Sequence, residues 1–168
     1  MPKTSAGLLI YKKVETKLRV LLVHPGGPFW EKRDFGAWSV PKGEVEDGED
    51  LIEAAHRELA EETGFTVTGV ASSLGQVRQS GGKLVYAWAI QGDVDLTEFR
   101  SSTFKMEWPR GSNTVRSFPE VDKVEWFDIS EARRRIHPAQ RAFLDALESN
   151  LSPTREKDRN VLRPDGSA

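Results

Sequence analysis

The sequence contains no cysteine and no long uninterrupted apolar run. Without cysteine the chain has no disulfide bridge, thiolate zinc ligand or cysteine nucleophile. Its apolar runs fall well short of the ~20 residues that a membrane-spanning helix needs. The first residues carry one lysine and do not resemble a secretory signal. We therefore expect a cytoplasmic protein with no membrane partner.

The sequence also has little net charge, with 24 basic and 26 acidic residues among 168. Its isoelectric point of about 6.0 does not suit a nucleic-acid partner, since such domains usually lie above ~9. The charge is unevenly distributed. Residues 43–62 hold nine acidic residues and one arginine, a net charge of −8, which leaves +6 for the rest of the chain. Such a dense anionic segment requires a physical reason.

Apolar patterning predicts interspersed strands and helices, which indicates an α/β fold with a mixed central sheet. The expected strands are Ala6–Val14, Leu18–His24, Gly36–Val40, Phe65–Val70, Leu74–Gln79, Lys83–Ile90 and Val121–Phe127. The expected helices are Glu49–Thr63, Ser130–Ile136 with Ser130 as its cap, and Pro138 to about Asn150. Residues 25–34 and 93–117 should be irregular. One domain should span residues 1–150, followed by a poorly ordered polar tail, residues 151–168.

Three glutamates, Glu58, Glu61 and Glu62, follow the i, i+3, i+4 spacing within the expected acidic helix. Side chains at these spacings share one face, roughly 5–6 Å apart, and like charges there repel. A hard cation such as Mg²⁺, Mn²⁺ or Ca²⁺ would neutralise them, because such ions prefer oxygen ligands. Arg57 could form a ladder with Glu49 and Glu53 that orients Glu58. An ordinary exposed acidic helix is the alternative interpretation.

The segment Gly43–Phe65 resembles the Nudix box, a motif of 23 residues. Its pattern is Gly, five residues, Glu, seven residues, Arg-Glu, an aliphatic residue, any residue, Glu-Glu, any residue, Gly and a hydrophobic residue. All nine constrained positions match: Gly43, Glu49, Arg57, Glu58, Leu59, Glu61, Glu62, Gly64 and Phe65. The order of strands and helices over about Ser5–Leu147 is also similar to the family's α/β/α sandwich.

Resemblance to the Nudix family implies a hydrolase that cleaves a diphosphate linked to another moiety, with Mg²⁺ or Mn²⁺ as cofactor. It implies that Glu58 and Glu62 bind metal, with Glu61 as a third ligand and a backbone carbonyl near Gly43 as another. Arg57 would position these groups together with Glu49. Some family members use a glutamate of the box as general base. Glu58 and Glu61, together with the positioning residue Arg57, are therefore the expected catalytic residues of the box.

Glu120 is the candidate outside the box. It lies six residues before Trp126, at a distance similar to that of a functional glutamate in the family's dinucleoside polyphosphate hydrolases. We expect Glu120 to be a further metal ligand or the base, with an exposed loop acid as the alternative. Glu98 and Glu107 are weaker rivals.

The tripeptide Pro41-Lys42-Gly43 resembles a variant common in the family's diadenosine polyphosphate and diphosphoinositol polyphosphate hydrolases. Lys42 could contact a phosphate as a mobile point charge. Arg78, Lys83 and Lys105 could add positive charge. Tyr86 shares a strand face with Trp88, and could stack a base or pack in the core. Phe29 and Trp30, in the loop after the second strand, are candidates for an exposed aromatic contact.

The expected function is therefore hydrolysis of a nucleoside polyphosphate, with dinucleoside polyphosphates as the first candidate substrates. The alternatives are a nucleotide-sugar or diphosphoinositol polyphosphate hydrolase, a non-catalytic nucleotide-sensing module, and a metal-stabilised structural domain. The complete glutamate set argues against a sensor. The sequence leaves an oligomer open.

Overall fold

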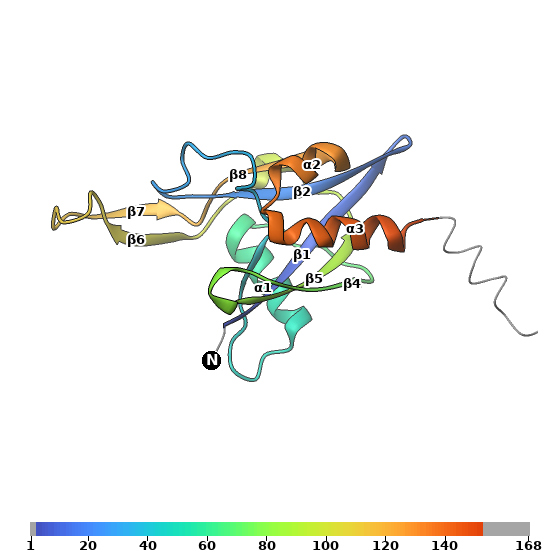
Figure 1. Ribbon diagram of the computed structural model, residues 1–168, viewed down its shortest axis with the longest axis horizontal. Coiled ribbons are helices and arrows are strands. Elements are labelled where there is room, and N and C mark those ends of the chain that lie inside the picture. Colours follow the sequence, from blue (N-terminus) through green and yellow to red (C-terminus); the bar gives the residue numbers. More distant parts are fainter. Residues whose placement is uncertain (1–2, 153–168) are drawn as a thin grey trace, which may run out of the picture.

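The computed structural model describes residues 3–152 and contains a six-stranded mixed sheet (Figure 1). Five strands follow the order β4-β5-β1-β2-β8, and β3 pairs separately with β1. Among the strand pairs that the structure describes in this sheet, only β1–β5 is parallel. The strands are β1 (Thr4–Val14), β2 (Lys17–Pro25), β3 (Lys42–Glu44), β4 (Ser72–Arg78), β5 (Leu84–Gln91) and β8 (Val121–Asp128).

Helices cover both faces of this sheet. On one face α1 (Leu51–Thr63) buries Ala54, Ala55 and Leu59 against alternate residues of β1. On the other face α2 (Ile129–Arg135) and α3 (Arg141–Asn150) pack over the remaining residues, with Phe143, Leu144 and Leu147 fully or almost fully buried. The expected α/β/α sandwich with a mixed sheet is confirmed, because each sheet face needs an apolar cover.

A two-stranded hairpin stands apart from the main sheet and projects from the body (Figure 1). It consists of β6 (Thr103–Glu107) and β7 (Val115–Pro119). The expectation of an irregular stretch over residues 93–117 is therefore wrong for residues 103–107 and 115–117. Burial alternates along β6 with the period of two that is typical of strands. The sequence signal is weak because the hairpin contributes little to either core.

Two expected strands are absent from the described residues. Gly36–Val40 makes only isolated bridges, Val23 with Ser39 and Trp38 with Ile136. Pro41 follows, and proline lacks the N–H group needed to continue a ladder. Residues 65–70 form no strand, although Phe65 is buried at 3% exposure. In both places buried apolar side chains explain the misleading pattern.

Helix ends differ from the expectations by a few residues. Helix α1 begins at Leu51 rather than at Glu49 and ends, as expected, at a left-handed Gly64 with φ of 78°. Helix α2 begins at Ile129, so Ser130 lies inside it and is not its cap. Pro138 opens a short 3₁₀ turn, Pro138–Gln140, before α3. The expected tail lies outside the described residues, apart from residues 151 and 152.

Within residues 3–152, no helix has the length and apolar character required to cross a membrane.

Candidate active site

Arg57 is the centre of a hydrogen-bond network around α1. Its Nε and Nη2 donate to the two carboxylate oxygens of Glu49 at 2.8 and 3.0 Å. Its Nη1 donates to Glu58 at 2.9 Å and to Glu61 at 3.1 Å, while Nη2 also reaches the Glu44 carbonyl at 2.9 Å. A planar guanidinium suits such a bidentate contact. Arg57 therefore ties the loop before α1 to the helix, and Glu49 rather than Glu53 holds it.

Gly43 lies directly against Glu58. A Cβ atom added at Gly43 would be 2.0 Å from the Glu58 carboxyl carbon, far inside a permissible contact. On the preceding residue, the backbone N–H of Lys42 donates to Oε2 of Glu62 at 3.2 Å. Strand β3 thus crosses over two of the three glutamates, and only glycine permits this close approach of backbone to carboxylate.

Burial and mutual repulsion shape the electrostatics of these carboxylates. Burial raises the pKa of Glu62 to about 8, against the opposing effect of Lys42, and the charges of Glu58 and Glu120 raise it further. Burial also raises the pKa of Glu58, although Arg57 opposes this shift. Crowded, partly desolvated carboxylates gain stability from a nearby cation. The pair Glu58 and Glu62 therefore has the electrostatic character of a cation-binding site.

The donor set fits a hard divalent ion, since carboxylate and carbonyl oxygens are the ligands that Mg²⁺ and Mn²⁺ prefer. In the arrangement that the structure describes for residues 3–152, no three acidic or histidine side chains converge on one point. Arg57 engages one oxygen each of Glu58 and Glu61, and the Glu61 side chain is 51% exposed. Each carboxylate keeps a second oxygen beyond these contacts. Glu58 and Glu62, with Gly43 beside them, are the residues that could hold the ion.

Glu120 lies close enough for its charge to act on Glu62. Its backbone is fixed on both sides, because its N–H donates to the Ser102 carbonyl at 2.8 Å and its carbonyl accepts from Gly26 at 2.9 Å. The side chain is exposed. The rival Glu107 instead accepts from the Gly111 N–H at 2.7 Å, within the β6–β7 hairpin. The structure thus brings Glu120 to the glutamates of the helix.

Two lysines gather beside the carboxylates. Burial and the positive charge of Lys83 lower the pKa of Lys42, while Glu62 and Glu58 oppose this shift. Burial and the charge of Lys42 also lower the pKa of His137. Lys83 and His137 therefore both lie near Lys42, beside the carboxylates. No sequence pattern connects His137 with the two lysines, because it lies far from them in the chain and only the fold brings them together.

Gln140 fixes the segments that carry these lysines. Its side chain is buried at 1% exposure. Its Oε1 accepts from the Val40 N–H at 3.0 Å, just before Pro41-Lys42, and its Nε2 donates to Gln79 Oε1 at 2.9 Å. Gln79 in turn donates its backbone N–H to the Lys83 carbonyl at 2.8 Å. No sequence pattern points to Gln140, since a lone glutamine in a helical region does not stand out from its neighbours.

The model of the NUDIX domain family matches residues 1–147 of this chain. The chain belongs to the Nudix family. The Nudix assignment rests on nearly the whole described chain as well as on the 23-residue box, whose Arg57, Gly43 and glutamates occupy the positions described above.

The Nudix relatives are named after different substrates. An RNA pyrophosphohydrolase of Caulobacter vibrioides is 50% identical over 52 residues, 28% of this chain and 30% of that protein. An oxidized purine nucleoside triphosphate hydrolase of Danio rerio is 32% identical over 119 residues, 67% of this chain and 65% of that protein. An asymmetrical bis(5′-nucleosyl)-tetraphosphatase of Caenorhabditis elegans is 40% identical over 62 residues, 37% of this chain and 41% of that protein. The chain thus matches only part of each relative's length.

Solved Nudix structures share the fold. A C. elegans Ap4A hydrolase binary complex has a TM-score of 0.64 at 23% identity, with 88% of this chain and 98% of that chain covered. The Nudix domain of Shewanella oneidensis NrtR, complexed with ADP ribose, also has a TM-score of 0.64, at 17% identity with 90% of each chain covered. At these identities the likeness establishes the architecture alone.

The expected substrate contacts lie in different places around the Nudix site. Lys42 and Lys83 come together, as described above. Arg78 is exposed and donates to the Gly82 carbonyl at 3.5 Å in the β4–β5 turn. Tyr86 pairs with Ala6 in the sheet and is half-buried on the face that α1 covers, like Trp88. Lys83 therefore lies beside Lys42, Arg78 bonds to the residue just before Lys83, and Tyr86 pairs with Ala6, which also pairs with Gly43.

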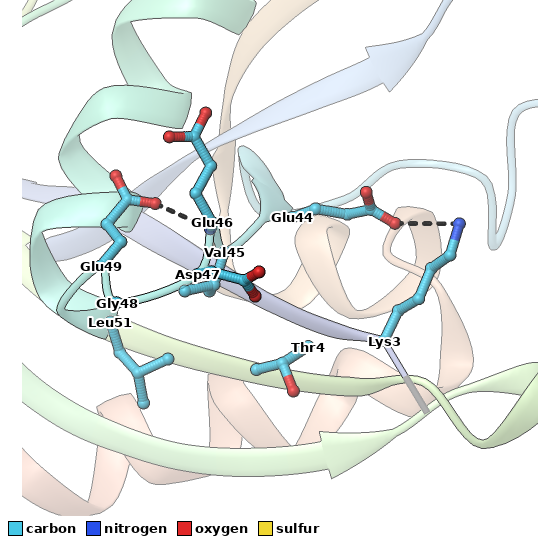
Figure 2. Close-up of a pocket in the computed structure, with 9 residues that line it drawn as sticks. All are labelled: Lys3, Thr4, Glu44, Val45, Glu46, Asp47, Gly48, Glu49 and Leu51. Atoms are coloured by element: carbon cyan, nitrogen blue, oxygen red, sulfur yellow. Dashed lines mark hydrogen bonds and ion pairs between the residues drawn. The ribbon is translucent and has the colours of Figure 1, made fainter. Parts of the chain in front are cut away.

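A pocket of about 520 Å³ adjoins the Nudix box at the loop before α1 (Figure 2). Glu44, Glu46 and Asp47, which are not constrained box positions, line it and are exposed. Glu44 pairs with Lys3 at 3.2 Å, and Glu49 accepts from the Glu46 N–H at 3.0 Å. This pocket belongs to the loop that Arg57 braces, and Glu58, Glu61 and Glu62 are not among the residues that line it.

Proposed function

We propose that this protein is a metal-dependent pyrophosphohydrolase that cleaves the diphosphate linkage of a nucleoside diphosphate joined to another moiety. One observation carries the proposal: Lys42 contacts Glu62 through its backbone while its ammonium group lies beside Lys83. A carboxylate pair suited to a divalent cation therefore adjoins two cations suited to phosphate. A magnesium-bound or manganese-bound polyphosphate presents the complementary arrangement of charge.

Glu58 and Glu62 would hold Mg²⁺ or Mn²⁺, with Glu61 and the Gly43 carbonyl as further ligands. When bound, such an ion neutralises phosphate charge and lowers the pKa of bound water. Arg57 keeps Glu58 and Glu61 in orientation through the contacts with Glu49. Its role is positioning, because its donors are committed to protein acceptors.

Water attacks one phosphorus of the anhydride, so that a new P–O bond forms while the bridging P–O bond breaks. A carboxylate near the attacking water accepts its proton, and the leaving phosphate takes the bridging oxygen. Glu120 is our candidate for this base, since its exposed carboxylate lies near Glu62 but is free of Arg57. Lys42 and Lys83 would bind the phosphates and stabilise the charge that develops on the leaving group.

Among substrates we place dinucleoside polyphosphates first. The Pro41-Lys42-Gly43 tripeptide, the paired lysines and the C. elegans tetraphosphatase relative all support this choice. A nucleotide sugar or a diphosphoinositol polyphosphate is the alternative substrate. A cytoplasmic location remains part of this proposal.

A substrate panel with Mg²⁺ or Mn²⁺ tests the proposal. It should contain dinucleoside polyphosphates, sugar nucleotides, deoxynucleoside triphosphates and diphosphoinositol phosphates. We expect metal-dependent release of phosphate-containing products, fastest with dinucleoside polyphosphates. Nucleotide binding without turnover of any compound would instead favour a sensing module.

A further inference from the structure

The β6–β7 hairpin begins beside the proposed active site. The N–H of Ser102 donates to the Glu61 carbonyl at 2.9 Å, and that of Arg100 donates to the Thr63 carbonyl at 2.9 Å. Both acceptors lie at the end of α1. At the other strand, Glu120 follows Pro119 and bonds back to Ser102 at 2.8 Å. The hairpin, visible as the projecting arm in Figure 1, is thus anchored to the helix that carries the glutamates.

One face of this hairpin is aromatic. Phe104 pairs with Phe118 across the strands, with ring centroids 5.9 Å apart, and Met106 pairs with Arg116. The Arg116 guanidinium lies 5.5 Å from the Phe118 ring centroid. These four side chains belong to one face because cross-strand partners project to the same side.

The loop after β2 borders the same face. A Cβ atom at Gly27 would be 3.0 Å from the Phe104 ring, so the loop backbone approaches the hairpin closely. Further along, the rings of Phe29 and Trp108 meet edge to face at 5.5 Å. Phe29 remains 51% exposed. The loop after β2 and the hairpin, which are far apart in the sequence, therefore form one surface. The rings of Phe29 and Trp108 on this surface are partly exposed to solvent.

The charge of the hairpin favours an anionic ligand. Residues 100–119 contain four basic residues and one acidic residue. Aromatic rings beside an arginine bind nucleobases by stacking and cation–π contact, while the positive charge attracts phosphate. This composition suits a nucleotide better than an apolar protein surface, for which Arg116 would have to be desolvated.

The length of the hairpin determines which part of a substrate can reach this surface. Strand β6 contains five residues, Thr103–Glu107, and Trp108 follows it, which corresponds to ~16 Å of extended strand at 3.3 Å per residue. Trp108 is thus well removed from the anchored end near Glu120. A base at that distance must be connected to the reacting phosphates by an extended chain, as the second nucleoside of a dinucleoside polyphosphate is.

We propose that Phe29, Trp108 and Arg116 form a binding platform for the second nucleoside of a dinucleoside polyphosphate. This inference rests on the proposed function and specifies its substrate. The aromatic rings stack on the base, and Arg116 interacts with the adjoining phosphate. The platform thereby distinguishes a polyphosphate with two nucleosides from one with a single nucleoside.

Binding and turnover of two ligands test the platform. Diadenosine tetraphosphate and adenosine 5′-tetraphosphate share four phosphates but differ in the second nucleoside. Binding is measured by calorimetry in EDTA, where hydrolysis does not interfere, and kcat/KM is measured with Mg²⁺. The variants are Phe29→Ala, Trp108→Ala and Arg116→Gln. Val115→Ala, on the opposite hairpin face at 65% exposure, and Lys13→Gln, at an exposed site on β1, are matched controls.

We expect each platform variant to weaken binding of diadenosine tetraphosphate and to lower its kcat/KM by about tenfold, the effect of losing one stacked base. The values for adenosine 5′-tetraphosphate and for both controls should stay within about twofold. Phe29→Ala keeps the test decisive if Trp108→Ala perturbs the hairpin, because Phe29 is already half exposed.

Equal losses on the two ligands would overturn the platform and indicate a general structural role. So would equal affinity of the wild-type protein for both ligands. A lower oligomeric state of the variants in sedimentation velocity would show instead that the face binds a second copy of this chain. If the wild-type protein binds the dinucleotide more tightly and only through these residues but does not hydrolyse it, the platform stands and the proposed hydrolase function fails.

Discussion

Gln140 and Gln79 are joined through their side chains, with Nε2 of Gln140 donating to Oε1 of Gln79 at 2.9 Å across 61 positions of sequence. Gln140 simultaneously accepts from the Val40 N–H. One buried amide thus connects the segment before Lys42 to the turn before Lys83. The spacing of the two lysines depends on a residue that touches neither of them in the described contacts.

We predict that Gln140→Met raises KM more than it lowers kcat. The substitution keeps the side-chain volume but leaves the buried Val40 N–H without its acceptor, at a cost of about 1–3 kcal/mol in unfolding free energy. Steady-state kinetics and urea denaturation measure the two effects. Gln76→Met, at an exposed position of β4, should change neither. A normal KM in a destabilised Gln140→Met protein would refute the positioning role.

We predict that Glu58→Gln and Glu62→Gln each lower kcat by at least about 100-fold while the protein remains folded. Loss of a metal ligand removes several kcal/mol of transition-state charge stabilisation. Calorimetric titration with Mn²⁺ should show weaker binding. Glu53→Gln, exposed on the same helix, is the control. Wild-type activity in both site variants would show that the metal site has been assigned wrongly.

Glu120→Gln separates a base from a surface acid. If Glu120 accepts the proton of the attacking water, the change should lower kcat by roughly 10²–10⁴, with little change in KM. Glu107→Gln, within the hairpin, is the comparison. An unchanged rate would remove Glu120 from the mechanism.

Gly43→Ala should be far more damaging than its size suggests. The added Cβ atom would meet the Glu58 carboxyl carbon at 2.0 Å, so either Glu58 or β3 must move. We expect a large loss of activity and weaker Mn²⁺ binding. Gly92→Ala is the matched control, because its nearest contact would be an ordinary 3.6 Å to Val67. Equal activity of the two variants would contradict the close approach.

The Glu49–Arg57 contact should make stability depend on pH. Hydrogen bonding to Arg57 lowers the pKa of Glu49 from 4.5 to about 2. A lowered pKa in the folded state stabilises the protein above the unfolded value and ceases to do so as pH falls from 4.5 through 2. Denaturation in EDTA should therefore show that Glu49→Gln destabilises the protein at pH 7 but makes little difference at pH 2. An equal difference at both pH values would contradict this.

The sequence predicted correctly those strands and helices whose apolar residues are buried in the way that their spacing indicates. Apart from Val14 at the end of β1, the apolar residues of β1, β2, β5 and β8 are buried or half-buried in the sheet. Gly64 ends α1 in the left-handed conformation that the sequence predicts. Gly36–Val40 was wrongly predicted to be a strand. Its Trp38 is buried, as a strand residue often is, but its backbone makes only isolated bridges.

Some residues of the candidate site could likewise be predicted from the sequence, and others could not. A helix sets the spacing of Glu58, Glu61 and Glu62 by itself, so their shared face was readable from the chain. Arg57 was readable too, but Glu53 was an equal partner until the turn before α1 placed Glu49 against its guanidinium. The helical spacing alone did not decide whether Glu49 or Glu53 is the partner of Arg57.

By itself, the sequence determined the family, the helix and the acidic face, because residues close in the chain have few conformations available and the Nudix box constrains nine positions. Only the tertiary structure decided that Lys42 lies beside Lys83, that Gln140 fixes their segments, and that Phe29 meets Trp108. These contacts join residues far apart in sequence. Their geometry is set by how the sheet, helices and hairpin pack, which no local pattern encodes.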